Sequence, residues 1–145
     1  MMFFVTSDLT HFQVDKIKDV LEDIWEKVEL RSDGSPDPIA ALNNNDVIGG
    51  LAFTYHPIPE PLPNAGKMAL WINALAVTPR WRGRGIASRL IQEAEAQAKA
   101  AGATEIYVYT DVPGLYLKLA WQKREDYDRN MVLSKSLIKA DELAG

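Results

Sequence analysis

Glycine and arginine are concentrated in one short segment of the chain, LAVTPRWRGRGIA, which covers residues 75–87. An apolar stretch precedes this segment and an amphipathic stretch follows it, which indicates a turn from a strand into a helix. Backbone N–H groups at the start of a helix attract anions, and glycine lets a ligand approach the main chain closely. Four of the seven arginines lie between Arg80 and Arg89, although the net charge of the chain is -4. We therefore predict that this turn binds the phosphate groups of an anionic cofactor.

The composition excludes several other classes of site. The acidic balance argues against a general nucleic-acid binder, which normally shows a broad basic face. Cysteine is absent, so disulfides, thiolate metal sites and cysteine nucleophiles are excluded, and no metal site is expected. No apolar stretch approaches the roughly 20 residues that span a bilayer, and the apolar N-terminus lacks the basic leader of a signal peptide. We expect one domain over residues 1–145, in the cytoplasm, with neither a nucleic-acid nor a membrane partner.

Hydrophobic periodicity and turn residues predict the elements that position this turn. Thr10 and Gln13 have the spacing of a capping box, and Gly102 ends the helix that follows the turn. Four prolines between Pro57 and Pro63 predict a stiff, extended loop, because proline fixes φ and cannot join a sheet ladder. In chain order we predict strands or helices at 1–5 (strand), 11–30 (helix), 39–42 and 47–55 (a hairpin), 67–77 (strand), 86–101 (helix), 105–110 (strand), 112–119 (a short helix capped by Asp111), and 121–125 with 131–134 (a hairpin).

This order of elements defines the expected fold class. We predict an α/β (mixed α+β) protein with one central mixed, mostly antiparallel sheet flanked by helices. The strand at 67–77 is nearly all apolar, as expected for a strand that is buried on both faces. It should be joined to the strand at 105–110 by a right-handed parallel crossover through the intervening helix.

The segment Arg82-Gly-Arg-Gly-Ile-Ala87, after Leu75-Ala-Val77, resembles the acetyl-coenzyme A signature of the GNAT superfamily, the Gcn5-related N-acetyltransferases. That signature runs Arg or Gln, two residues, Gly, one residue, then Gly or Ala. Arg82, Gly85 and Ala87 fill its three defined places. The resemblance is strong over residues 68–122, and the N-terminal third is similar to the family only in element order. It implies a GNAT-like fold, acetyl-coenzyme A as cofactor, and N-acetyltransferase activity.

The resemblance also implies which groups hold the cofactor. Main-chain groups of Leu75 and Val77, with Ala76 between them, would bind the pantetheine arm. N–H donors at a helix start need no particular side chain, so only the glycines and the small alanine are sterically required. Two arginine side chains would add positive charge at the periphery. The residues that would hold the pyrophosphate are Arg82, Gly83, Arg84, Gly85, Ile86 and Ala87.

A second segment, Leu115-Tyr-Leu-Lys-Leu-Ala-Trp121, resembles the family's Leu-Tyr-x-x-x-Gly-Phe, whose tyrosine hydroxyl lies near the cofactor sulfur. The resemblance implies that Tyr116 is the general acid, because a phenol within hydrogen-bond reach stabilises or protonates a departing thiolate. The alternative is a core tyrosine whose hydroxyl is satisfied. The chain departs from the family at Ala120, where glycine is usual, and at Tyr109, where asparagine often precedes the helix. Thr110 or Asp111 could replace that asparagine.

Asn73 is the departure that affects the chemistry most, because many relatives carry a catalytic glutamate at this place. A carboxamide does not accept a proton at useful pH. The acceptor amine would lose its proton through water held by Asn73 or by backbone carbonyls, to His56 or Glu60, or before binding. Ordered water is the preferred route of these. The alternative for Asn73 is a buried amide that satisfies the edges of the sheet.

The acceptor is predicted from the resemblance alone, as a small-molecule amine or a peptide amine. In the family the acceptor cleft lies between the first helix, the loop before the fourth strand and the last hairpin. Carboxylates in these segments of the chain could attract a cationic amine, and a solvated face explains them equally well. The last strands of the family often meet a partner, so a homodimer is a further expectation.

Two other functions compete with acetyl transfer. Gly83 and Gly85 lie between strand and helix as in a dinucleotide-binding oxidoreductase, but Ser88 replaces the third glycine of that fingerprint. A non-catalytic acyl-coenzyme A sensor or interaction module would keep the phosphate-binding turn without the chemistry. Asn73 and Ala120 leave this second alternative open.

Overall fold

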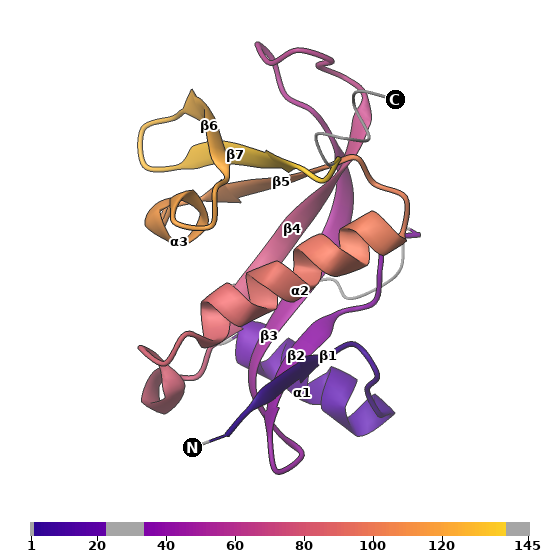
Figure 1. Ribbon diagram of the computed structural model, residues 1–145, viewed down its shortest axis with the longest axis vertical. Helices are drawn as coiled ribbons and strands as arrows, with labels where there is room; N and C mark the ends of the chain where they lie inside the picture. Colours follow the sequence, from indigo (N-terminus) through magenta and orange to yellow (C-terminus); the bar gives the residue numbers. More distant parts are fainter. Residues whose placement is uncertain (1, 23–33, 139–145) are drawn as a thin grey trace.

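A sheet of seven strands runs through the molecule, in the order β1-β2-β3-β4-β5-β7-β6 (Figure 1). The computed structural model describes residues 2–22 and 34–138, and the following refers to them. In chain order the elements are β1 (Phe4–Thr6), α1 (His11–Glu22), β2 (Ile39–Asn43), β3 (Asp46–Pro57), β4 (Met68–Val77), the 3-10 helix η1 (Pro79–Trp81), α2 (Ile86–Ala100), β5 (Glu105–Thr110), α3 (Gly114–Leu117), β6 (Gln122–Asp126) and β7 (Met131–Ser136).

The sheet is mixed and mostly antiparallel, as predicted. Within the described residues, β4 and β5 form the one parallel pair, and α2 connects them. A doubly wound nucleotide-binding fold requires a mostly parallel sheet, so the oxidoreductase alternative is wrong. No helix in the described part of the chain has the length and apolar character that crossing a bilayer requires.

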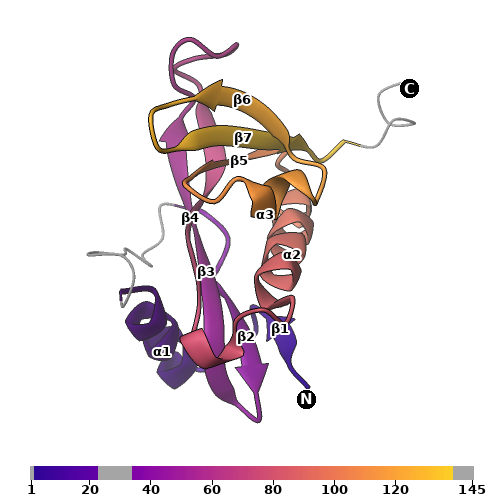
Figure 2. The same cartoon turned by 90° about the vertical axis from the view of Figure 1, so that its left-hand side faces the viewer.

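The two long helices cover opposite faces of the sheet (Figure 2). The larger core lies under α2, where Leu90, Ile91 and Ala94 are completely buried. On the other face, Ile17 and Leu21 of α1 pack on small residues of the central strands, chiefly alanines. Small side chains let this helix lie close to the sheet, and the helices thereby hold β3 and β4 in place from both sides.

The structure confirms the predicted start of α1 and corrects the start of α3. The backbone N–H of Thr10 donates to Oε1 of Gln13 at 3.0 Å, and the N–H of Gln13 donates to Oγ1 of Thr10 at 3.1 Å. The predicted part of this helix from residue 23 to residue 30 lies outside the described residues. Asp111 does not cap α3, because the helix begins at Gly114 with Pro113 as its N-cap residue and without a side-chain cap. Thr110 Oγ1 accepts the N–H of Val112 at 3.0 Å in the segment before the helix.

The proline-rich loop between β3 and β4 is closed by its own backbone. The N–H of Ile58 donates to the carbonyl of Lys67, and the N–H of Gly66 donates to the carbonyl of Ile58, both at 2.8 Å. Ile58 and Leu62 are buried beneath the loop against Trp71. The loop therefore has a defined shape where it borders the sheet. The predicted extended conformation is wrong, because residues 60–66 fold into turns, and Pro57 is the last residue of β3, opposite Met68.

Candidate active site

The sheet opens between β4 and β5. Leu70–Ile72 of β4 pair with Ile106–Val108 of β5, yet both strands continue beyond this ladder. On the other side of β4 the register shifts between Ala52 and Phe53, which face Ala74 and Ile72. Asn73 is thus the extra residue of a β-bulge, a feature that ends strand pairing and redirects side chains. Asn73 marks the point where the two strands separate.

The first cavity lies between the separated strands and the start of α2, and it has a volume of about 450 Å³. It contains both catalytic candidates, Asn73 and Tyr116, and every predicted cofactor-binding residue except Arg84. Sequence reasoning missed several of its walls, among them Trp81, Ser88, Val112, Leu115 and Lys118. These residues lie one to a few positions from the recognised motifs. Their side chains line the cavity because of how the chain folds, which the motifs do not encode.

The turn into α2 leaves its main chain uncovered on the cavity side. Gly83 and Gly85 have φ angles of 77° and 81°, in the left-handed region that favours glycine. A Cβ atom at either position would have no neighbour within 4 Å, so the adjacent space is open. Gly85 is the N-cap of α2, and no side chain caps the helix there. The first N–H groups of α2 therefore remain available to an anionic ligand.

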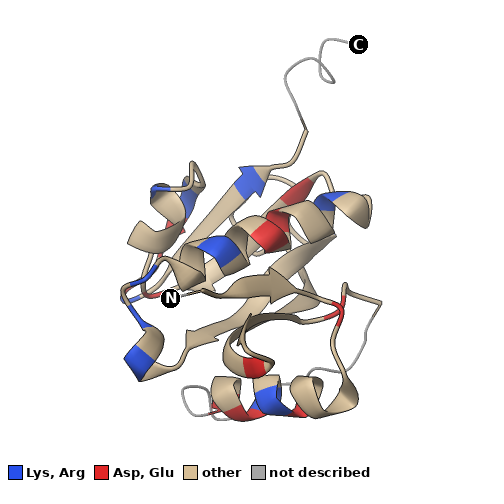
Figure 3. Ribbon diagram, turned by 60° about the horizontal axis from the view of Figure 1, so that its bottom comes forward, with Lys and Arg blue, Asp and Glu red and all other residues tan. Residues whose placement is uncertain are grey.

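The arginine side chains of the turn make contacts within the turn itself. Nε of Arg82 donates to the carbonyl oxygen of Val77 at 2.9 Å, which ties the loop to the end of β4. The guanidinium of Arg84 lies 4.9 Å from the ring centroid of Trp81 and donates to the carbonyl of Arg80 at 3.3 Å. Figure 3 shows basic residues grouped on this turn, whereas α1 carries both signs of charge. The grouping raises the local potential and also stabilises the shape of the loop.

Tyr116 is buried, and its hydroxyl has no partner among the described residues. The side chain is 2% exposed, and its ring meets Trp121 edge-on at 5.0 Å. No fully buried polar side-chain atom in the described segments lacks a hydrogen bond, so the unpaired hydroxyl of Tyr116 must reach the cavity. Burial raises the pKa of Tyr116, which keeps the phenol protonated and able to donate at neutral pH.

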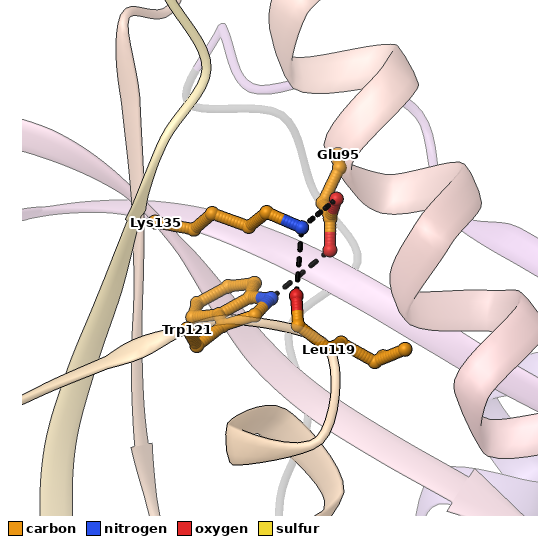
Figure 4. Close-up of polar contacts among 4 residues, drawn as sticks. All are labelled: Glu95, Leu119, Trp121 and Lys135. Carbon is orange, nitrogen blue, oxygen red and sulfur yellow. Dashed lines mark hydrogen bonds and ion pairs between the residues drawn. The ribbon is translucent and has the colours of Figure 1, made fainter.

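A polar network holds the segment that follows Tyr116 (Figure 4). Glu95 of α2 accepts from Nζ of Lys135 at 2.8 Å and from Nε1 of Trp121 at 3.0 Å, and the lysine also donates to the carbonyl of Leu119 at 2.8 Å. The Glu95 and Lys135 side chains are only 16% and 26% exposed. The network connects three elements: α2, β7 and the turn that follows α3. Trp121 belongs to this network and also contacts the Tyr116 ring, so the network limits the positions that the ring can adopt.

Ala120 adopts the backbone conformation that glycine favours, at the position where the family usually has glycine. Its φ is +70°, and its N–H donates to the carbonyl of Leu117 at 3.1 Å as α3 ends. The left-handed region costs a non-glycine residue about 1–2 kcal/mol. The turn keeps the expected geometry in spite of the substitution.

A second cavity, of about 460 Å³, meets the first at the break in the sheet. Ile72, Asn73, Ala74 and Tyr109 line both cavities. The Asn73 side chain is exposed there, so the interpretation as a buried amide is wrong. The other walls of the second cavity are Thr54, His56, Pro59, Trp71, Tyr127 and Val132.

Aromatic residues rather than carboxylates dominate the second cavity. Trp71 packs on Tyr107 at a centroid distance of 5.0 Å, and Tyr109 meets Tyr127 edge-on at 5.9 Å. No Asp, Glu, Lys or Arg is among the described residues that line it. The acidic residues of the last hairpin do not line this cavity, and Glu26 and Glu29 of the predicted first helix lie outside the described residues.

Comparison with known proteins gives one family. A sequence profile of the acetyltransferase (GNAT) family matches residues 5–122, and no curated protein sequence matches. Arabidopsis thaliana NAA60 in complex with acetyl-CoA is 14% identical with a TM-score of 0.68, covering 93% of this chain and 98% of its own. The PaiA N-acetyltransferase from Thermoplasma acidophilum in complex with coenzyme A is 14% identical with a TM-score of 0.67, covering 94% and 99%.

A third solved structure has the same fold and a different kind of acceptor in its name. The aminoglycoside 6'-N-acetyltransferase from Enterococcus faecium is 16% identical with a TM-score of 0.68, covering 96% of this chain and 98% of its own. At these identities the likeness establishes the fold of the chain. The residues of its own two cavities must indicate the chemistry.

Proposed function

Because the chain belongs to the GNAT family of acetyltransferases, we propose that it transfers an acetyl group from acetyl-coenzyme A to a primary amine within a ternary complex. One observation carries this proposal: two cavities enter the broken sheet and meet at Asn73. A cofactor in the first cavity and an acceptor in the second would have their reacting atoms side by side. Holding two reactants next to each other in this way accounts for a large part of the rate acceleration in enzymatic reactions between two substrates.

The first cavity fits two polar parts of acetyl-coenzyme A, the pyrophosphate and the pantetheine arm. The uncapped start of α2 and the space beside Gly83 and Gly85 fit a pyrophosphate. The edge of β4 at Leu75 and Val77 has no partner strand on the side of β5 and lines the cavity, so it fits the amide groups of a pantetheine arm, although the Val77 carbonyl oxygen already accepts from Nε of Arg82. Acetyl-coenzyme A would supply the activated thioester.

Acetyl transfer requires attack of the amine on the thioester, stabilisation of the negative charge on the carbonyl oxygen, and protonation of the sulfur leaving group. The amine nitrogen attacks the carbonyl carbon, a C–N bond forms and the C–S bond breaks. Main-chain N–H groups at the open edge of β4 would stabilise the charge on the carbonyl oxygen. The hydroxyl of Tyr116, which is protonated and faces the cavity, would donate to the departing sulfur.

The second candidate function is a non-catalytic acyl-coenzyme A sensor, and Asn73 is the observation that favours it. Incubation of the purified protein with acetyl-coenzyme A and a panel of primary amines separates the two. We expect amine-dependent release of free thiol and a matching mass increase on one class of amine. Tight binding of acetyl-coenzyme A without amine-dependent release would support the sensor and contradict the transferase.

A further inference from the structure

Few of the described residues that line the two cavities can accept a proton. The titratable residues lining the second cavity are His56, Tyr109 and Tyr127. The first cavity adds Arg82, Asp111, Tyr116 and Lys118. Phenols, guanidinium groups and ammonium groups do not accept protons at neutral pH. Among the described lining residues, this leaves His56 and Asp111 as candidate bases.

His56 lies too far along the sheet to act on an amine at Asn73. In the ladder it faces Ala69, which is four residues before Asn73 on β4, and four residues of strand span roughly 13 Å. Its Nδ1 lies 2.8 Å from the carbonyl oxygen of Pro57, and its ring stands edge-on to Trp71 at 5.8 Å. These contacts fix the imidazole ring beside Pro57 and Trp71, at the C-terminal end of β3.

Asp111 lies on the cofactor side of the junction. It follows the last residue of β5, is exposed, and lines the first cavity without lining the second. Tyr109 is the last residue of this segment that both cavities share. Of the described residues, an amine that enters through the second cavity would therefore meet Asn73 and Tyr109 at the junction, and neither of these is a base.

The proton balance of acetyl transfer then depends on the state in which the amine arrives. An uncharged amine attacks with its lone pair, and the one N–H proton that it loses is taken up by the leaving sulfur, so no other base is needed. An ammonium ion has no lone pair and must first give a second proton to some acceptor.

We propose that the acceptor is a weakly basic primary amine, of which roughly a tenth or more is uncharged near neutral pH, carried on an electrically neutral body, such as the α-amino group of a peptide or an electron-poor small amine. This inference rests on the proposed acetyl transfer. An α-amino group has a roughly 100-fold or larger uncharged fraction than a lysine-like alkylamine at the same pH. The cavity would thus select by basicity as well as by shape.

The test uses the unmodified protein and four amines of nearly equal shape, ethylamine and its mono-, di- and trifluoro derivatives, whose basicity falls stepwise. The readout is kcat/KM as a function of pH. We expect the inflection to move with the pKa of each amine. At about pH 7 the difluoro amine should exceed ethylamine by roughly tenfold or more, because its much larger uncharged fraction outweighs its weaker nucleophilicity. In a second arm, a lysine-containing peptide with a free α-amino group should be acetylated only at that group, and the N-terminally blocked peptide should be inert.

The opposite result is equally clear. An inflection at one fixed pH for all four amines, or faster transfer to the blocked lysine peptide, would overturn the inference. His56→Gln and Asp111→Asn would then show which group is the base, because the fixed inflection would disappear from one of them. Absence of turnover with every amine would instead contradict acetyl transfer itself, so the two proposals fail in distinguishable ways.

Discussion

Tyr116 combines near-complete burial with a hydroxyl that no described residue binds. Because no fully buried polar side-chain atom of the described residues lacks a partner, this hydroxyl must reach the first cavity, which Tyr116 lines. We predict that Tyr116→Phe lowers kcat by about a hundredfold, the scale of general acid catalysis, and leaves the Kd of acetyl-coenzyme A little changed. Steady-state kinetics and calorimetry measure the two quantities.

Tyr107 is the matched control for this substitution. It is also buried, but its hydroxyl donates to Glu105 at 2.7 Å and it lines neither cavity. Burial and the Glu105 carboxylate raise the pKa of Tyr107 to about 12. Tyr107→Phe should therefore change kcat by less than about threefold. Equal losses in both variants would show that Tyr116 acts through packing rather than through its hydroxyl.

At the residue scale, the sequence predicted backbone conformation better than side-chain contacts. The glycines of the turn were predicted because their conformation depends on local sequence. The contacts of Arg82 with Val77 and of Arg84 with Trp81 depend on how the loop folds back, which spacing does not encode. The aromatic lining of the second cavity was missed for the same reason. Its location was foreseen, because the resemblance places an acceptor cleft at the loop before β4 and the last hairpin, which supply Pro59 and Tyr127.

Two glycines flank α2 in similar backbone conformations and offer a matched pair of variants. Gly85 precedes the helix with φ of 81°, and Gly102 follows it with φ of 91°; a Cβ atom at either meets nothing within 4 Å. Alanine at each position should lower the free energy of unfolding by about 1–2 kcal/mol. Only Gly85→Ala should weaken the binding of coenzyme A, because its methyl group enters the space beside the uncapped N–H groups.

Thermal unfolding and calorimetry on both glycine variants separate stability from binding. A normal Kd for coenzyme A in Gly85→Ala would show that the pyrophosphate lies elsewhere. An equal loss of affinity in Gly102→Ala would show that binding is sensitive to the stability of α2 and not to the space at its start.

The network around Glu95 connects a helix, a turn and a strand, and its removal should affect both stability and catalysis. Glu95→Ala leaves Nε1 of Trp121 and Nζ of Lys135 without this acceptor. We expect the free energy of unfolding to fall by roughly 2–3 kcal/mol. The exposed pair of Lys18 and Glu22, 3.8 Å apart on α1, is the control, and Glu22→Ala should change stability by less than about 0.5 kcal/mol.

A double-mutant cycle tests whether the Glu95 network positions Tyr116. If the network acts through the hydroxyl, Glu95→Ala should lower kcat severalfold in the native chain and should have little further effect after Tyr116→Phe. Independent, additive losses of kcat would show that the network supports the fold without aligning the hydroxyl. Urea unfolding of all four proteins confirms that each is folded during the assay.

At the element scale, local sequence signals predicted which helices and strands exist. The details that depend on pairing between strands could not be predicted from single segments. The hairpins, α2 and β5 follow from periodicity and turn residues, and the structure confirms them. The prediction that β4 is buried on both faces fails at Asn73, because the bulge opposite β3 turns that side chain into the opening. A β-bulge depends on the pairing of two strands, so the sequence of one strand does not predict it.

The molecule as a whole consists of a sheet that is open at its centre, with β1 to β4 on one side of the gap and β5 to β7 on the other. A cofactor in the first cavity would contact both sides of the gap. It would therefore bind only the folded state of the chain and not the unfolded state. At roughly 100 times its Kd, such a ligand stabilises a protein by about 2.7 kcal/mol. For a chain of this length that corresponds to a rise in Tm of roughly 8 °C.

Hydrogen exchange should locate this stabilisation at the gap. The main-chain groups of β4 beyond Ile72 and of β5 beyond Val108 have no strand partner across the opening. Coenzyme A should slow amide exchange at residues 74–77 and at the first turn of α2, while β1 and β2 on the far edge change little. A rise in Tm with uniform protection would indicate binding elsewhere. Gly85→Ala should reduce the rise in Tm and Gly102→Ala should retain it, because bridging the two sides depends on anchoring the pyrophosphate at α2.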